Sequence, residues 1–274
     1  MIDTIKISHE CPVSLLQDSI FFNDYQYCLV HLMEENEKYH DWFISKFRSS
    51  CPDGEILLDN SIFELGTSFE PEQYAVWAEK IQPNSYIVPD ALEDYAKTIT
   101  AFERFVRDYP DLPGAKIGVV QGKTWTEIVD CYKFMSASAD CIAFSFDLSL
   151  YNYTGYGNNR LELCTTARQN CIARLISENI WNYNKPHHLL GCSLAREFRW
   201  YRENNVRGIR SLDTSNPVVA GLKGIRYNDT YGLTTKPSQK LFTMITHEVT
   251  ADEVENINYN VEMFRQIVNG RDPR

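Results

Sequence analysis

Several features that mark other classes of protein are missing from this sequence of 274 residues. No stretch approaches the run of about 20 apolar residues that a membrane-spanning helix needs, and the first residues lack the pattern of a signal peptide. A Gly-rich dinucleotide-binding turn, a linker, a low-complexity tract and a short repeat are also absent. We therefore expect no membrane partner and a single domain that spans residues 1–274.

The eight cysteines form no Cys-x-x-Cys pair, and the chain lacks the paired spacing of a closed zinc site. Cys28 and Cys141 lie inside apolar runs, where a cysteine usually behaves as a small buried hydrophobe. Cysteines of this kind favour a reducing compartment. We therefore expect a cytoplasmic protein without a bound metal.

Basic residues are scarce relative to acidic ones: 27 Lys and Arg stand against 37 Asp and Glu, for a net charge of -10. Phosphate contacts need Lys and Arg, so the overall charge favours a small-molecule enzyme. The charge is uneven, however. Residues 193–240 hold nine basic and four acidic side chains, a local +5, whereas residues 1–192 carry -12. Overall acidity therefore does not exclude nucleic acid, and it predicts weak, salt-sensitive binding on one face.

Eight short β-type runs recur along the chain, and most are continuously apolar, as is typical of strands buried on both faces of a parallel sheet. The predicted strands are 4–8, 25–32, 55–59, 85–89, 116–121, 141–147, 187–192 and 208–213. Helices are predicted near 34–48, 71–81, 92–109, 124–136, 158–180 and 194–205, with a C-terminal helical segment at about 250–269. Ser68 and Pro71 mark the start of one helix. The alternation predicts an α/β fold of the (β/α)8 TIM-barrel class, with a doubly wound open sheet as the alternative.

Polar side chains stand at the ends of several of these runs: Asp59, Asp90, Gln121, Asp147 and Asp213. In a barrel the carboxyl ends of the strands meet at one mouth, so we expect these side chains to converge there. Each aspartate alone could instead cap a helix or bind loop amides. The joint arrangement favours a site, although Asp147 keeps the capping interpretation.

Gln121 is followed by Gly122 and preceded by the run at 118–120, which suggests close approach of the backbone to a ligand. Two carboxylates around one carbon support substitution at a glycosidic centre, with one as nucleophile and the other as general acid/base. A neighbouring amide could read the edge of a nucleobase. The residues alone thus indicate glycosyl transfer or glycoside hydrolysis.

Four segments resemble, in the same order, motifs of the tRNA-guanine transglycosylase superfamily, and most closely its DNA-modifying branch, the DpdA-type DNA-guanine transglycosylases. They are LDNSIF at 58–63, GVVQG at 118–122, HLLG at 188–191 and LDTSNP at 212–217. The likeness extends over about residues 1–220. It implies a barrel of that kind without a cofactor, and the exchange of guanine in DNA for a 7-deazaguanine base such as preQ0.

The resemblance also implies a role for individual residues. Asp213 would be the nucleophile that attacks C1′ of the nucleotide, and Asp59 would be the general acid/base. Asp90 and Gln121 would bind the base. Further substrate contacts are expected at Gly122, Ser145 and Gly191, the last through a turn that packs beside the substrate.

The sequence departs from the resembled family in two places. The family's DSGGF is here DNSIF at 59–63, so both glycines are replaced. The tRNA enzymes also hold a structural zinc downstream of the nucleophile, in a Cys-x-Cys-x-x-Cys cluster with a histidine, whereas no cysteine follows Cys192 here. We therefore expect a barrel lacking the zinc-binding subdomain, acting on DNA. Such a protein would be phage-encoded, would work in the host cytoplasm and would help viral DNA evade restriction.

Other functions stay open at this point. The same exchange on tRNA is the nearest alternative, followed by a barrel glycoside or nucleoside hydrolase. An inactive partner subunit of a transglycosylase is a further one, although the retention of Asp59 and Asp213 argues against it. The sequence leaves a homodimer open as a further partner.

The basic segment brackets Asp213, so we expect phosphate contacts from its side chains. The expected contacts are Arg196, Arg199, Arg210, Lys223 and Arg226. The spacing of Arg196, Arg199 and Arg202 could instead form one solvated helix face. Three tyrosines within residues 151–156 could stack on a flipped base and its neighbours, or could pack on the barrel rim.

Overall fold

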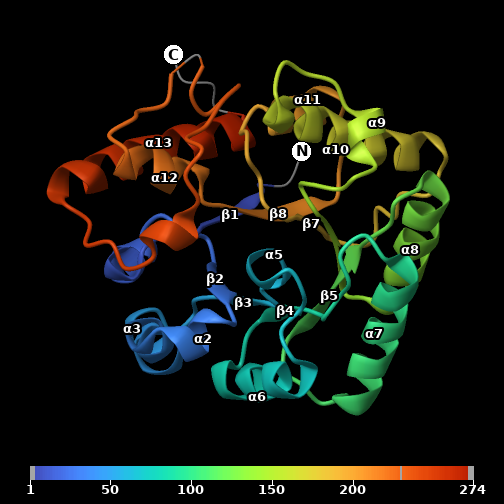
Figure 1. Ribbon diagram of the computed structural model, residues 1–274, viewed down its shortest axis with the longest axis horizontal. Coiled ribbons are helices and arrows are strands. Elements are labelled where there is room, and N and C mark those ends of the chain that lie inside the picture. Colours follow the sequence, from blue (N-terminus) through green and yellow to red (C-terminus); the bar gives the residue numbers. More distant parts are fainter. Residues whose placement is uncertain (1–3, 229, 271–274) are drawn as a thin grey trace.

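The computed structural model describes residues 4–228 and 230–270, and its centre is a ring of eight parallel strands (Figure 1). The strands are β1 Lys6–His9, β2 Gln26–Leu29, β3 Ile56–Asp59, β4 Ser85–Ile87, β5 Ala115–Val120, β6 Cys141–Phe144, β7 His187–Leu189 and β8 Ile209–Thr214. Neighbours in sequence pair from β2 through β8, and β8 pairs with β1. This is the (β/α)8 TIM barrel that the alternation predicts, and the open doubly wound alternative is wrong.

Asp24 closes the ring between β1 and β2. Its backbone N–H donates to the carbonyl of Ile7 (2.9 Å), and its carboxylate accepts from the N–H of Ile7 (2.8 Å). Arg265 of the C-terminal helix holds the same carboxylate at 2.7 Å. The side chain of Asp24 thus replaces ladder hydrogen bonds at the seam, and it ties the end of the chain to the beginning of the barrel.

Helices cover the outside of the strands, as predicted. Those of seven residues or more are α6 Pro71–Ile81, α7 Tyr95–Asp108, α8 Trp125–Ser138, α10 Arg160–Ser177, α11 Glu197–Glu203, α12 Asn216–Leu222 and α13 Ala251–Asn269. Capping boxes begin α8 at Thr124 and α13 at Thr250, because each threonine exchanges hydrogen bonds with the glutamate three residues later. The C-terminal helical segment is therefore confirmed as α13, which packs against α11 and α12.

The helix predicted at 34–48 is interrupted at Asn36. Before it lies α2 Leu32–Glu35, and after it α3 Glu37–Asp41, a π-helical stretch at Trp42–Lys46 and α4 Phe47–Ser50 follow one another without a gap. Asn36 has an extended backbone, and its side chain accepts a hydrogen bond from the N–H of Tyr39, so it ends one helix and caps the next. Ser68 does not cap α6 either. Glu70 does, and Ser68 instead binds the backbone of Asp90.

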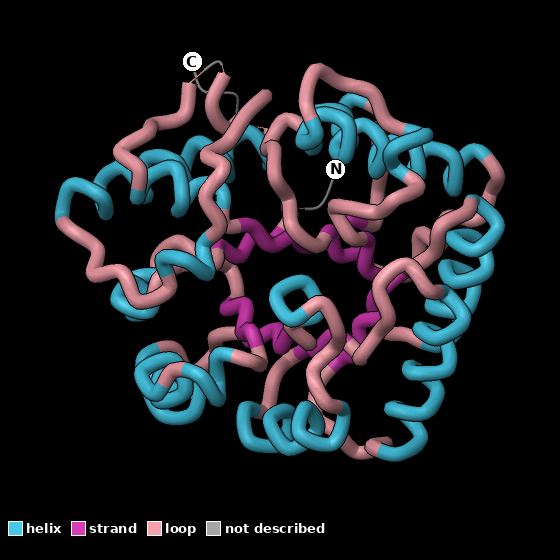
Figure 2. Tube along the Cα trace, in the orientation of Figure 1, coloured by secondary structure: helices cyan, strands magenta, loops and turns pink. Residues whose placement is uncertain are grey.

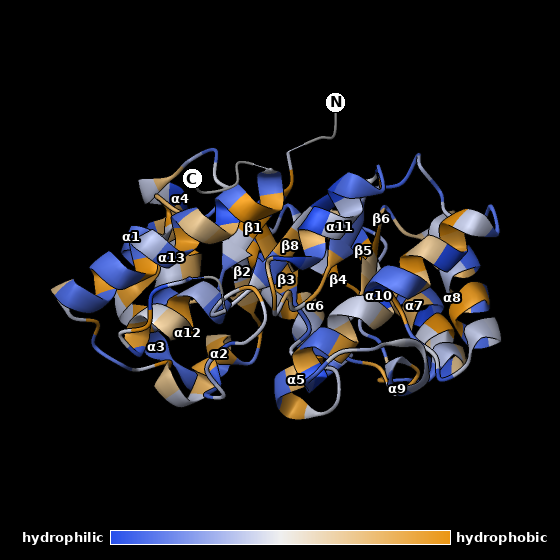
Figure 3. Cartoon of the chain, turned by 90° about the horizontal axis from the view of Figure 1, so that it is seen from above, coloured by the Kyte–Doolittle hydropathy of each residue, from blue (hydrophilic) through white to orange (hydrophobic). Residues whose placement is uncertain are grey.

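The sequence does not predict α12, nor three helices of one turn: α1 Leu16–Ser19, α5 Ile62–Leu65 and α9 Tyr151–Thr154. Of these, α5 matters most for function. It follows β3 directly, and Figure 2 shows it inside the outline of the strand ring. In the view turned by 90°, α5 and α9 lie at the same end of the barrel (Figure 3). This is the carboxyl end of the strands, where barrels carry their sites.

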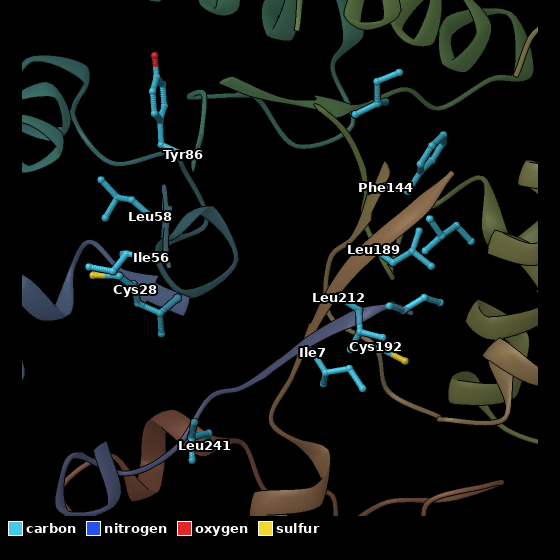
Figure 4. Packing of buried hydrophobic residues seen from close by; sticks show 14 of the residues in the cluster. Ile7, Cys28, Ile56, Leu58, Tyr86, Phe144, Leu189, Cys192, Leu212 and Leu241 are labelled. Carbon is cyan, nitrogen blue, oxygen red and sulfur yellow. The ribbon is translucent and has the colours of Figure 1, made fainter. Parts of the chain in front are cut away.

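Two apolar layers hold the barrel. The larger one packs strands against helices, and Figure 4 shows part of it, with Phe144, Leu189 and Leu212 on β6, β7 and β8. The smaller one fills the interior: Tyr25, Leu57, Ile87, Ile117, Val119 and Ala143. Because side chains alternate along a strand, Asp59, Gln121 and Ser145 stand two residues beyond members of this interior layer. They continue the inward-facing rows toward the mouth.

Candidate functional site

Asp213 lies near the end of β8 and is almost completely buried, with 3% of its surface exposed. The N–H of Gly191 lies 3.1 Å from both of its carboxylate oxygens. Nε2 of His188 lies 3.1 Å from Oδ1, and because a carboxylate accepts, this nitrogen carries the hydrogen. Two donors from β7 and the turn after it therefore fix the carboxylate of β8. An attacking carboxylate needs such a fixed orientation.

Gly191 takes a backbone conformation that suits glycine. Its φ is +62°, in the left-handed region, which turns its N–H toward Asp213. A Cβ at this position would meet only Phe146, at 3.6 Å, so conformation rather than space requires the glycine. The sequence predicts that Gly191 packs beside the substrate, and the contact that the structure gives it is to the carboxylate of Asp213.

A buried ion pair supports this turn from behind. Nε and Nη2 of Arg168 on α10 each lie 2.8 Å from a carboxylate oxygen of Glu197, and both side chains are fully buried. Nη1 of Arg168 donates to the carbonyls of Leu190 (2.7 Å) and Phe144 (3.3 Å). The pair therefore ties the ends of β6 and β7 together next to Gly191.

Asp59, at the end of β3, is also buried, with 7% of its surface exposed. Its carboxylate accepts from the hydroxyl of Tyr27 (2.8 Å) and from the N–H of Ser61 (2.7 Å). Burial raises the pKa of Asp59 well above its usual range, the carboxylate of Glu64 raises it further, and these two hydrogen bonds lower it in part. A raised pKa favours the protonated form of the carboxyl group, which is the form that acts as a general acid.

Two aromatic rings connect the carboxylates. The ring of Tyr27 lies parallel to that of His188, with centroids 6.4 Å apart. Tyr27 donates to Asp59 through its hydroxyl, and His188 donates to Asp213. A continuous path of contacts thus runs across the barrel from one predicted catalytic aspartate to the other.

Two further carboxyl groups join the mouth, and sequence reasoning missed both. Glu10 follows β1, and burial together with Asp213 raises its pKa. Glu64 lies on α5, where Oε2 is buried without a hydrogen-bond partner among the described residues. Burial and Asp213 also raise the pKa of Glu64. Together with Asp59 and Asp213, they make a set of four acidic side chains that repel one another whenever all are ionised.

Asp90 and Gln121 meet directly, as their positions at strand ends predict. Nε2 of Gln121 donates to Oδ2 of Asp90 (2.7 Å), and the side-chain amide of Asn60 donates to Oδ1 (2.7 Å). The other end of Gln121 accepts from the N–H of Glu93 (2.9 Å). Each carboxylate oxygen has a second lone pair, and Nε2 of Gln121 has a second hydrogen. The group therefore keeps donor and acceptor capacity for a ligand that reaches it.

Gly122 and Ser145 lie beside this group but take part differently. A Cβ on Gly122 would come within 2.8 Å of Cβ of Glu127 and 3.0 Å of the backbone nitrogen of Ile128. The close approach predicted for Gly122 is therefore an approach to α8. The carbonyl of Ser145 accepts from the hydroxyl of Tyr151 (3.2 Å), which is buried and belongs to the barrel packing. Tyr153 and Tyr156 from the same loop are exposed.

None of the aspartates at the mouth caps a helix. Asp59 does bind a loop amide, that of Ser61, so this part of the alternative interpretation holds for it. Asp147, which was assigned to capping, is half exposed and instead forms an ion pair with Arg160.

The basic side chains expected to bind phosphate are dispersed. Arg196 pairs with Glu162 (3.1 Å), and Arg226 binds Glu255 and Asn256 of α13. Arg210 is exposed in the first half of β8, at the opposite end of the strand from Asp213. The others are Arg199, half-buried on α11, and Lys223, exposed after α12. These placements put Arg210 away from the mouth.

Two lysines of the same basic segment do reach the mouth. Nζ of Lys236 donates to Oγ of Ser193 (3.1 Å), and its charge acts on Glu10. Nζ of Lys240 lies 5.3 Å from the ring centroid of Phe63 on α5 and acts on Glu64. The basic composition of residues 193–240 indicates that this segment carries positive charge, but only the fold shows that Lys236 and Lys240 are the side chains at the mouth.

No group of three or more His, Cys, Asp or Glu side chains among the described residues is arranged to hold a metal ion. All eight cysteines lie in the described part of the chain and are free thiols, six of them buried. No helix within residues 4–228 and 230–270 is long and apolar enough to cross a membrane.

The likeness of this chain to known proteins is one of chain path. No known protein family matches the chain, and no curated protein matches it. A solved structure with a similar chain path is a HpcH/HpaI aldolase/citrate lyase family protein from Burkholderia cenocepacia J2315. It is 12% identical, covers 77% of this chain and 88% of its own, and superimposes with a TM-score of 0.47.

Proposed function

We propose that this chain is an enzyme, a guanine transglycosylase that exchanges guanine in DNA for a 7-deazaguanine base. The observation that carries the proposal is the arrangement of two buried aspartates in the barrel mouth. Asp213 is oriented by Gly191 and His188, while the raised pKa of Asp59 suits a proton donor. A nucleophile paired with an acid is the requirement for substitution at a glycosidic carbon.

The reaction would take two steps. In the first, a carboxylate oxygen of Asp213 attacks C1′, the bond from C1′ to N9 of guanine breaks, and Asp59 gives its proton to the departing base. In the second, N9 of the incoming 7-deazaguanine attacks C1′, the bond to Asp213 breaks, and Asp59 takes the proton that N9 loses. Asp59 and Asp213 are thereby restored, and no cofactor is consumed.

The group of Asp90, Gln121 and Asn60 supports recognition of the base in this proposal. A guanine-type base offers N–H donors and a carbonyl acceptor on one edge. The free lone pairs of Asp90 could accept from these donors, and the second N–H of Gln121 could donate to the carbonyl. Ser61 gives further support, because it occupies the position of the first family glycine and has a φ of +56°, a conformation that glycine favours.

The preference for DNA rests on the sequence resemblance, so its test must compare nucleic acids. Purified protein is incubated with a radiolabelled 7-deazaguanine and either guanine-containing DNA or tRNA. We expect label in DNA, and none when Asp213 is replaced by alanine. Label in tRNA alone would move the proposal to the tRNA exchange. Release of guanine without incorporation of the label would indicate a hydrolase.

A further inference from the structure

Two exposed aromatic rings flank one lysine beside the barrel mouth. Phe63 on α5 is 71% exposed, and Phe242, in the 3-10 turn at Leu241–Met244, is 59% exposed. Nζ of Lys240 lies 5.3 Å from the ring centroid of Phe63 and 5.8 Å from that of Phe242. The two rings come from segments almost 180 residues apart in sequence, and the lysine joins them.

The helix α5 exposes apolar side chains and buries part of an acidic one, the reverse of an ordinary amphipathic helix. Its acidic residue, Glu64, has a buried oxygen and acts on Asp59, while its apolar residues Phe63 and Leu65 are exposed. A helix that folds only to bury apolar surface would do the reverse. Exposed apolar side chains grouped beside a site are typical of a surface that a ligand covers.

The charges around this surface select the kind of ligand. The interior of the mouth is acidic, with Glu10 and Glu64 close to Asp213, so it favours a phosphate at the edge of the mouth over one deep inside. Lys236 and Lys240 lie at its edge and offer positive charge there. Flat aromatic rings beside such cations match a nucleobase and its adjoining phosphate.

We propose that Phe63, Lys240 and Phe242 form a stacking clamp for an unpaired nucleotide next to the reacting one. The clamp rests on the proposed function, because that function brings a flipped nucleotide into the mouth and leaves its neighbour unstacked. Both rings contact the neighbouring base, and Lys240 contacts its phosphate. The occupant is therefore a single-stranded or locally opened nucleic acid segment.

The test measures the affinity of the whole protein for a fluorescein-labelled single-stranded DNA of about 12 nucleotides, within the usual range of such sites, by fluorescence anisotropy. A lost stacking contact weakens binding by about 5- to 150-fold. We expect Phe63→Ala and Phe242→Ala each to fall in this range, and Phe63→Trp to keep the affinity. Lys240→Gln should make binding less sensitive to salt, because one phosphate contact is lost.

Phe21→Ala is the matched control, because Phe21 is 83% exposed but lies between α1 and β2, near the amino end of the strands. It should bind DNA as the unchanged protein does. The proposal would be overturned if the clamp variants bound DNA as tightly as the unchanged protein. It would also be overturned if Phe21→Ala lost as much affinity for DNA as they do, or if the unchanged protein did not bind DNA. Ring-dependent binding without base exchange would leave the clamp standing and remove only the transglycosylase function.

Discussion

The backbone N–H of Gly191 lies 3.1 Å from both carboxylate oxygens of Asp213, and this contact orients the proposed nucleophile. The contact depends on the left-handed backbone of Gly191. The carbonyl of Leu190, the residue before it, accepts a hydrogen bond from the buried Arg168. The chemistry proposed for the mouth therefore depends on the turn after β7 as much as on β8.

Gly191→Ala tests this dependence. An alanine at positive φ costs roughly 1–2 kcal/mol, so the turn should relax and move its N–H away from Asp213. We expect a strong loss of base exchange in a protein that still folds. Gly224→Ala is the control, because Gly224 has a φ of +68° and open space around it, but lies beyond α12. Equal activity in the two variants would show that the contact has no role.

Glu64→Gln should change the pH dependence of base exchange. The Glu64 carboxylate raises the pKa of Asp59, so neutralising it lowers that pKa. Asp59 must be protonated to serve the departing base, and activity is lost as pH rises through its pKa. The basic limb of the pH–rate profile should therefore move to lower pH in Glu64→Gln. Glu103→Gln, an exposed change on α7, should leave the limb in place. A limb that stays unmoved in Glu64→Gln would contradict the assigned role of Asp59.

Glu197→Gln should destabilise the fold. It leaves the fully buried guanidinium of Arg168 without its counter-charge, which costs about 3–5 kcal/mol. Urea denaturation at neutral pH measures the free energy of unfolding. Glu178→Gln removes an exposed partner of Arg174 and should change this value little. If both variants unfold alike, the buried pair does not stabilise the fold.

His9 should make the protein less stable in mild acid. Burial lowers its pKa to about 3, and neither ring nitrogen has a hydrogen-bond partner among the described residues. The unfolded chain protonates this histidine near pH 6.5 whereas the folded chain does not, so stability is present above that pH and falls below it. At pH 5 the loss from His9 is about 2 kcal/mol.

Urea denaturation at pH 7.5 and pH 5 measures this effect. His9→Leu should lose less stability between the two pH values than the unchanged protein does, by about 2 kcal/mol. His40→Asn, a change at a half-buried histidine on α3, should show the same loss as the unchanged protein. An identical loss in all three would rule out His9 as the cause.

The strands and the meeting of Asp59, Asp90, Gln121 and Asp213 could be predicted, because buried parallel strands have apolar sequences and end at one mouth. Glu10 could have been found by the same rule, since it follows β1. Glu64 could not have been found in this way. It lies on a helix of four residues that begins after the left-handed Ser61, and so short a helix shows no repeating pattern of apolar residues. The break at Asn36 was missed because the apolar residues around it keep a helical spacing.

The most direct test of the central claim is to search for a covalent bond between DNA and Asp213. End-labelled, guanine-containing DNA is incubated with the protein, quenched in denaturant and separated on a denaturing gel, and the linked peptide is identified by mass spectrometry. The account predicts a DNA–protein adduct on the peptide that contains Asp213, absent from Asp213→Asn and retained in Glu103→Gln. An adduct that persists in Asp213→Asn, or that maps to another residue, would contradict it.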